Sequence, residues 1–342
     1  MNIYIAWSMA AVIGFVVAFL LGYVIIPWLH KLSFGQTILD IGPKWHEKKQ
    51  GTPIMGGLMF MAALVVACAA VIITDRIIGG DIVTGNAVNA SAAKVKFYGG
   101  ILMAFAFALI GFADDFIKAV KKRNLGLTVV QKTFAQLVVS IVYLGTLYSV
   151  GATYMFIPFF GMVDLKIFFW FFGIFVIYCV TNAVNFTDGV DGLCASVTVS
   201  AAVALLVVAY LRNNLGVSML CAALAGSCAG YLIWNWNPAK VMMGDTGSMF
   251  LGGMIIAAAY AIDCPLIIVP IGIIYVIEFA SDIIQISYFK ATHGKRIFKM
   301  APIHHHFEMC GWKEKKIVKI FTLVNAIGGV AGILLVYFGN IK

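Results

Sequence analysis

Ten long apolar segments restrict the fold of this 342-residue chain more than any other feature. They occupy residues 4–29, 54–73, 97–113, 127–150, 167–184, 193–211, 216–234, 246–262, 264–289 and 317–339. Each is close to the ~20 apolar residues that a helix needs to cross a hydrocarbon layer of ~30 Å. Charged residues make up 11% of the chain, against about 25% in a soluble domain. The sequence therefore predicts an all-α polytopic membrane protein of about ten transmembrane helices, with a single domain over residues 1–342.

The basic residues are concentrated in alternate loops. Of the 24 Lys and Arg residues, 18 lie in or beside the loops 30–53, 114–126, 185–192, 235–245 and 290–316. Because basic residues resist translocation, these loops are predicted to face the cytoplasm, with both termini on the periplasmic side. The net charge of +9 suits an anionic lipid leaflet and an anionic substrate. Nucleic acid is a poor partner, since the basic residues are dispersed over membrane loops.

Acidic residues are scarce. Of the 15 in the chain, five gather at the predicted cytoplasmic ends of the spans: Asp114, Asp115, Asp188, Asp191 and Asp245. Carboxylates are costly near hydrocarbon and usually mark a functional cavity. Asp114 and Asp115 are followed by a basic face that includes Lys118 and Lys122. Neighbours on a helix point about 100° apart, so the two aspartates are expected to serve different partners. For the lysines alone, interfacial anchoring is a sufficient explanation.

A second polar group is the stretch TNAVNFTDGVDG, residues 181–192. Asn182, Asn185, Asp188 and Asp191 recur every three residues. In one straight helix this series would drift by about 180°, so a common face requires a break, which Gly189 supplies with Gly192. Asp191 is expected to cap the helix that follows.

A third group surrounds Asp245, which begins the eighth span after Gly244. A plain helix cap explains an aspartate here, and so does a metal ligand beside a glycine that lets a ligand approach closely. Hard oxygen ligands without a CxxC pair favour Mg²⁺, which proteins hold with one or two carboxylates plus substrate phosphates and water. Asp245 and Asp188 are the predicted metal ligands, and a diphosphate is the predicted substrate group.

Three consecutive histidines stand in APIHHHFE, residues 301–308. On a helix His304, His305 and His306 cover about 200° of arc, so they cannot all bind one metal ion. We expect two imidazoles to face a pyrophosphate and the third to pack locally.

In this order, the motifs ADDF, NAVNFTDGVDGL, MGDTGS and APIHHHFE resemble the MraY family of phospho-N-acetylmuramoyl-pentapeptide-transferases. The resemblance extends over essentially the whole chain. It implies transfer of phospho-MurNAc-pentapeptide from UDP-MurNAc-pentapeptide to undecaprenyl phosphate, giving lipid I and UMP for peptidoglycan synthesis. It also implies a Mg²⁺ requirement, an active-site cleft at the cytoplasmic face of the bacterial inner membrane, a homodimer, and a target for nucleoside antibiotics.

The resemblance also assigns roles to individual residues. The catalytic set it implies is Asp114, Asp115, Asp245, His304 and His305. The substrate-binding set it implies is Lys49, Lys118, Lys122, Lys132, Asn182, Asn185, Asp188, Gly189, Asp191, Asn235, Gly244 and Gln285, to which we add His306. Two positions depart from the family pattern: Ile54 replaces a hydroxyl-bearing residue, and Met242 stands where an aromatic side chain would stack on uracil.

Two other functions are compatible with parts of the pattern. A UDP-GlcNAc:polyprenyl-phosphate GlcNAc-1-phosphate transferase of the same superfamily would share the aspartates but should differ in the APIHHHFE loop. A secondary transporter also places carboxylates at broken helices, although its site would lie near the bilayer midplane. The residues do not separate direct attack by the lipid phosphate from a route through a phospho-enzyme.

Overall fold

The computed structural model describes residues 1–32, 51–85, 87–121 and 125–339. The helices are α1 (Ile3–Lys31), α2 (Gly57–Ile77), α3 (Ala90–Lys94), α4 (Gly100–Lys121), α5 (Val129–Ser149), α6 (Phe168–Phe186), α7 (Leu193–Leu211), α8 (Leu215–Asn235), α9 (Gly244–Ala261), α10 (Ile268–Ile271), α11 (Ile273–Ala291), α12 (Ile303–Met309) and α13 (Glu314–Gly339). Strands β1 (Tyr154–Ile157) and β2 (Gly161–Asp164) form an antiparallel hairpin that pairs Tyr154 with Asp164. The fold is mostly helical as predicted, and this hairpin is an addition that the sequence prediction did not contain.

The apolar segments form membrane-length helices. Within the described residues, eight helical segments are long and apolar enough to cross a membrane, or nine if one bent pair counts as a single span. The remaining predicted segment, 246–262, forms α9, which lies outside that set. Every residue of α9 from Thr246 to Ala261 is buried, because other helices surround it. A helix enclosed on all sides is mainly apolar or small all round rather than on one face, as α9 is.

The predicted span 264–289 is bent rather than straight. Its two parts, Pro265–Ile271 and Ile273–Ala291, meet at 88°. The break leaves backbone groups without helical partners, and the buried side chain of Asn325 on α13 binds them. Its Nδ2 donates to the Ile271 carbonyl at 2.9 Å, and its Oδ1 accepts from the Ile274 N–H at 3.3 Å. A non-helical backbone is tolerated at membrane depth when protein groups satisfy it in this way.

Small residues bring α1 and α8 into close contact. The buried face of α1 carries Ala6, Ala10, Gly14, Ala18 and Gly22 at intervals of four residues. On α8, a Cβ added to Gly226 would lie 2.1 Å from the Ala11 carbonyl oxygen. Such small faces allow helix backbones to approach closely where lipid gives no hydrophobic drive for association.

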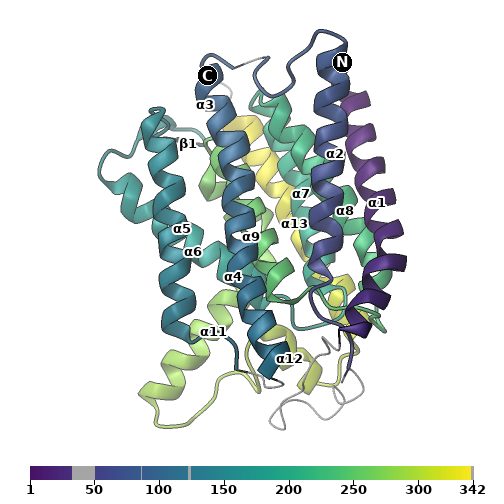
Figure 1. The fold of residues 1–342 in the computed structure, drawn as a ribbon. Helices are drawn as coiled ribbons and strands as arrows, with labels where there is room; N and C mark the ends of the chain where they lie inside the picture. The colour runs from purple at the N-terminus through teal and green to yellow at the C-terminus, as the bar shows by residue number, and fades with distance from the viewer. Residues whose placement is uncertain (33–50, 86, 122–124, 340–342) are drawn as a thin grey trace.

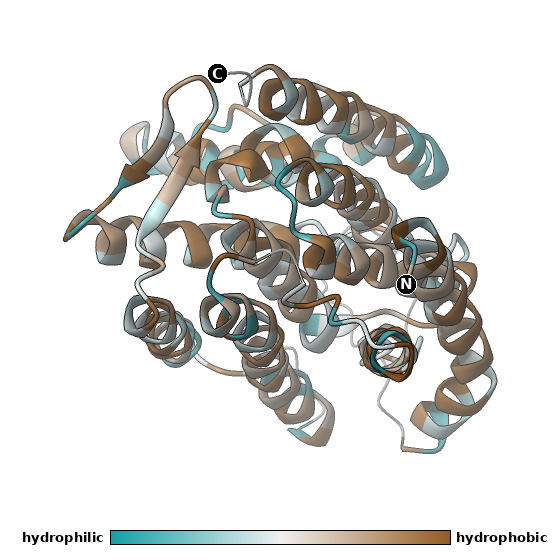
Figure 2. Cartoon of the chain, turned by 90° about the horizontal axis from the view of Figure 1, so that it is seen from above, coloured by the Kyte–Doolittle hydropathy of each residue, from teal (hydrophilic) through white to brown (hydrophobic). Residues whose placement is uncertain are grey.

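The chain begins and ends at the same end of the bundle. The Met1 amino group donates to Asp75 at the end of α2, at 2.7 Å, and the Phe159 N–H in the hairpin donates to the Gly339 carbonyl at 3.3 Å. Figure 1 shows both chain ends at the top, with α12 and the lower parts of α4 and α11 at the opposite end. Figure 2, seen from above, shows hydrophobic residues along most of the helical surface and hydrophilic residues mainly in loops.

Candidate active site

Three carboxylates meet at the end of the bundle away from the termini. Asp114 and Asp115 lie in the last turns of α4, and Asp245 lies in the first turn of α9. One ligand oxygen from each lies within 4.8 Å of the others. Asp245 is 130 positions from Asp115 in sequence, so the packing of α4 on α9 brings it to the adjacent pair.

A glycine makes this packing possible. A Cβ added to Gly111 of α4 would lie 2.1 Å from the carbonyl oxygen of Asp245 and 2.6 Å from the Thr246 backbone nitrogen. Both atoms belong to the backbone, so no side-chain rotation can relieve the clash. The close approach of the two helices therefore depends on a glycine at this position.

Alanine in place of Gly111 should consequently lower the free energy of unfolding by about 1–3 kcal/mol, the usual cost of overpacking. Thermal or denaturant unfolding in detergent measures the change. Gly145→Ala is the matched control, because the nearest atom to its added Cβ is 3.9 Å away, on Trp170. Equal stability of the two variants would contradict the close α4–α9 contact.

The adjacent aspartates bind different partners, as predicted. Asp114 Oδ1 accepts from the Leu127 N–H at 2.7 Å, which fixes the chain just before α5. Asp115 Oδ2 accepts from the Thr246 N–H at 2.9 Å and from the Thr246 hydroxyl at 2.7 Å. Asp115 thus binds the free N–H groups at the start of α9, and it does so from a neighbouring helix. Asp245 is left to face the basic residues.

Two lysines lie against the carboxylates. Lys118 Nζ is 2.5 Å from Asp114 Oδ2 and 3.1 Å from Asp245 Oδ2. Lys132, in the first turn of α5, places its Nζ 3.0 Å from the same Asp245 oxygen. Asn185, near the end of α6, donates to Asp245 Oδ1 at 2.8 Å. Asp245 is therefore the residue on which α4, α5, α6 and α9 converge.

The donor set suits a hard divalent cation. At formal charges, three carboxylates facing two ammonium groups leave one excess negative charge, before any substrate phosphate is added. Carboxylate oxygens without thiolate ligands are the donors that Mg²⁺ prefers. The structure groups Asp245 with Asp114 and Asp115, and it does not place Asp188 in this group. The pairing of Asp188 with Asp245 stays a prediction from the sequence.

The three histidines lie on the short helix α12 and are used differently. His304 is fully buried, and its Nδ1 lies 3.0 Å from Glu278 Oε2 on α11. His305 Nδ1 lies 2.6 Å from Glu308 Oε2 on the same helix. His306 Nδ1 accepts from the Lys299 backbone N–H at 3.1 Å. Each of the three rings thus has a polar contact within the protein, and the expectation that two of them face a pyrophosphate stays a prediction.

The loop between α6 and α7 contacts α12. A Cβ added to Gly189 would lie 2.2 Å from His304 Nε2, so this loop rests directly on the histidine ring. The prediction that Asp191 caps α7 is wrong. Gly192 occupies the cap position at φ +79 without a side-chain cap, and Asp191 accepts instead from Asn237 Nδ2 at 3.1 Å and the Ala239 N–H at 3.0 Å.

Several predicted substrate-binding residues make internal hydrogen bonds. Asn182 exchanges hydrogen bonds with Gln136 of α5, and Asn235 accepts from the Gly192 N–H at 3.0 Å. Gln285 accepts from the Ile297 and Phe298 N–H groups and so holds the loop before α12. Gly244 adopts φ +70, and a Cβ there would lie 2.5 Å from Asp115 Oδ2. Lys49 and Lys122 lie outside the described residues.

The sequence prediction assigned no role to the glutamates that bind His304 and His305. Glu308 stands three residues after His305, a spacing that brings side chains together on a helix. That spacing could have predicted the contact between Glu308 and His305 from the sequence alone. The contact between Glu278 and His304 joins two separate helices, so no spacing within one helix predicts it.

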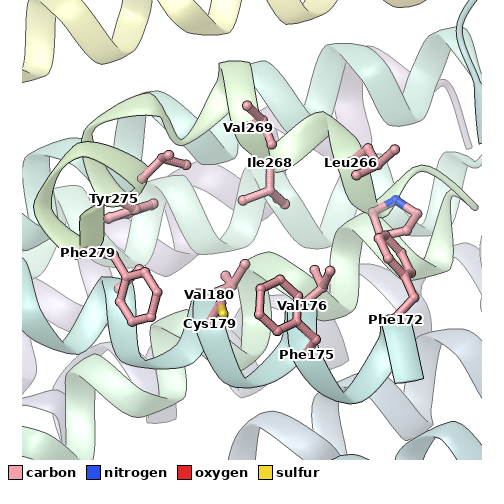
Figure 3. Close-up of a pocket in the computed structure, with 13 residues that line it drawn as sticks. Phe172, Phe175, Val176, Cys179, Val180, Leu266, Ile268, Val269, Tyr275 and Phe279 are labelled. Atoms are coloured by element: carbon pink, nitrogen blue, oxygen red, sulfur yellow. The ribbon is translucent and has the colours of Figure 1, made fainter. Parts of the chain in front are cut away.

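An apolar cavity lies beside α6. Its volume is about 300 Å³, and it is lined by side chains of α6 and of the bent pair around α10. Figure 3 shows Phe175 and Val180 of α6 facing Ile268 and Val269 across it. Asn185, which binds Asp245, lies on the same helix, further toward the acidic cluster.

Comparison with known proteins gives concordant results. The family model for glycosyl transferase family 4 matches residues 97–263. Similar full-length proteins carry the name phospho-N-acetylmuramoyl-pentapeptide-transferase. That of Listeria welshimeri is 43% identical over 343 residues, covering 99% of this chain and 100% of the relative. That of Clostridium perfringens strain 13 is 45% identical over 321 residues, covering 93% of this chain and 95% of the relative.

Proposed function

The chain belongs to the family of phospho-N-acetylmuramoyl-pentapeptide-transferases, and from this premise we propose that it transfers phospho-MurNAc-pentapeptide from UDP-MurNAc-pentapeptide to undecaprenyl phosphate, giving lipid I and UMP. The observation that carries the proposal is the convergence of Asp114, Asp115 and Asp245 with Lys118 and Lys132 at one end of a membrane-length helical bundle. The names of the full-length relatives do not favour the GlcNAc-1-phosphate transferase alternative.

We propose direct attack, in which an oxygen of the lipid phosphate attacks the β-phosphorus of the UDP-sugar. The bond from that phosphorus to the bridging oxygen breaks, and UMP leaves with the bridging oxygen. Asp114, at the end of α4, is our candidate for removing a proton from the lipid phosphate or for orienting it. Lys118 and Lys132 both contact Asp245 and are placed to stabilise the charge that develops on UMP.

Asp245 is the proposed principal ligand for Mg²⁺, with Asp114 and Asp115 within reach of the same position. A bound Mg²⁺ would neutralise diphosphate oxygens and polarise the phosphorus. His305 and the loop around Gly189 belong to the proposed binding surface for the rest of the nucleotide sugar.

The apolar cavity beside α6 is the proposed site for part of the isoprenoid chain. Its lining is almost wholly apolar, and α6 leads from the cavity to Asn185 in the acidic cluster. A lipid chain lying along α6 would therefore carry its phosphate toward Asp245. We further propose one transferase domain in the bacterial inner membrane, with periplasmic termini, an active-site cleft facing the cytoplasm, and a homodimeric assembly.

Purified protein in detergent tests this function directly. With undecaprenyl phosphate and Mg²⁺ present, UDP-MurNAc-pentapeptide should yield equimolar UMP and lipid I, while UDP-GlcNAc should yield neither above background. UMP release that depends on the lipid acceptor also excludes a pure transporter. Turnover of UDP-GlcNAc with no turnover of UDP-MurNAc-pentapeptide would overturn the proposal in favour of the GlcNAc-1-phosphate transferase.

A further inference from the structure

His304 and His305 share one arrangement, in which a glutamate holds the Nδ1 atom of each ring. Glu278 reaches His304 from α11 at 3.0 Å, and Glu308 reaches His305 from within α12 at 2.6 Å. The two imidazole centroids are 4.1 Å apart. A carboxylate at Nδ1 keeps the proton on that nitrogen, so that Nε2 is the nitrogen that can accept a hydrogen bond. The two rings are thus oriented by two separate carboxylates.

The two pairs differ in their access to a substrate. The side chains of His304 and Glu278 are both 0% exposed, whereas the side chain of His305 is 14% exposed. A fully enclosed ring cannot touch a nucleotide sugar in this conformation. His305, at the edge of the same helix, is accessible from outside.

The contacts of His304 show that it packs against other parts of the protein. Its Nε2 has no hydrogen-bond partner among the described residues and lies against Gly189, where a Cβ would be only 2.2 Å away. Its backbone N–H also faces Glu278 Oε2, at 3.4 Å. The ring therefore stands where α11, α12 and the loop between α6 and α7 meet.

Burying the carboxylate of Glu278 between α11, α12 and the loop between α6 and α7 costs free energy. Glu278 Oε1 is buried and has no hydrogen-bond partner in the described part of the chain, so the stabilisation of this carboxylate depends on His304. Buried ionisable groups near the membrane are costly and generally serve a function. An apolar residue at position 278 would pack the helix without this cost.

Building on the proposed function, we propose that Glu278 is a positioning residue, which acts through His304 to fix the Gly189 loop and the ring of His305. His305, oriented by Glu308, is the histidine that contacts the phosphates of the nucleotide sugar. The two histidines thus have different tasks, and each task has its own carboxylate.

Kinetics of full-length variants in detergent test this division. Glu278→Gln keeps the shape and an acceptor for the Nδ1 proton but loses the charge, and should lower kcat about tenfold with KM for the UDP-sugar nearly unchanged. Glu278→Asp keeps the charge and should recover part of the loss. Asp164→Asn, an exposed carboxylate on the hairpin, should leave kcat unchanged.

A spectroscopic readout keeps the test independent of turnover. In ¹⁵N-histidine-labelled protein, the His304 signal, assigned by its loss in His304→Gln, should show a protonated Nδ1 and an unprotonated Nε2. Glu278→Ala should abolish that preference, whereas Glu308→Gln should leave it intact. An unchanged His304 signal in Glu278→Ala, or wild-type kcat in both Glu278→Gln and Glu278→Ala, would overturn the inference. An inactive wild-type protein with the expected His304 signal would instead count against the proposed function alone.

Discussion

Asparagine in place of Asp245 should lower kcat by about 10³-fold or more, because it removes a charge that several groups share. Lys118 and Lys132 both contact Asp245 Oδ2, and Asn185 donates to Oδ1. The substitution preserves the size of the side chain but offers the lysines only a neutral carbonyl oxygen. It also takes away one of the three carboxylates available to a cation. The rate of UMP release at saturating substrates measures the effect.

A control variant and a measurement of folding show whether the loss of rate in Asp245→Asn is specific to the site. Asp164→Asn removes a carboxylate at the other end of the bundle and should retain the wild-type rate. The unfolding temperature of Asp245→Asn shows whether the variant is folded, because the amide keeps the volume of the side chain while its NH2 group must face either Asn185 or the two lysines, which are all donors. A kcat within tenfold of wild type in a folded Asp245→Asn protein would exclude Asp245 from the chemistry.

The spans were predictable from sequence because their signal is local. Most of the apolar segments are long enough to indicate a membrane helix without knowledge of their neighbours, and the exception is 246–262, which forms the enclosed helix α9. The 88° bend between Ile271 and Ile273 was not predictable in this way. Its backbone groups are satisfied by Asn325, which lies about fifty residues further along the chain. A buried asparagine on an apolar helix does not reveal from sequence which helix it will bind.

In the candidate site, too, some features could be predicted from the sequence and others could not. Carboxylates are scarce in this chain, and the sequence predicted that five of them gather at one end. The geometry brings three of the five, Asp114, Asp115 and Asp245, within reach of one another. Amide side chains were harder to interpret. Asn182 and Gln285 lie near the same end, yet the first binds Gln136 and the second binds the loop before α12. Polar side chains in a membrane protein also bond helices to one another, and spacing alone does not separate that role from substrate binding.

Removal of divalent cations should reduce turnover to about 1% of the original rate or less, since a cation that neutralises a diphosphate supplies several kcal/mol of transition-state stabilisation. The measurement is UMP release after exhaustive chelation, followed by titration with Mg²⁺, which should restore the full rate. The structural reason is the cluster of Asp114, Asp115 and Asp245, three carboxylates that face only two lysines and can offer oxygen ligands to one cation.

The residual activity of Asp245→Asn links this prediction to the first. If Asp245 holds the cation, the Mg²⁺ concentration for half-maximal rate should rise at least tenfold in that variant, corresponding to a loss of about 1.4 kcal/mol in binding free energy. Asp164→Asn should keep the wild-type Mg²⁺ dependence. An unchanged Mg²⁺ dependence in a slowed Asp245→Asn protein would move the cation to other ligands, and Asp245 would then act only by holding Lys118 and Lys132 in place. Full turnover by chelated protein, with metal analysis below one equivalent, would contradict a role for the cation altogether.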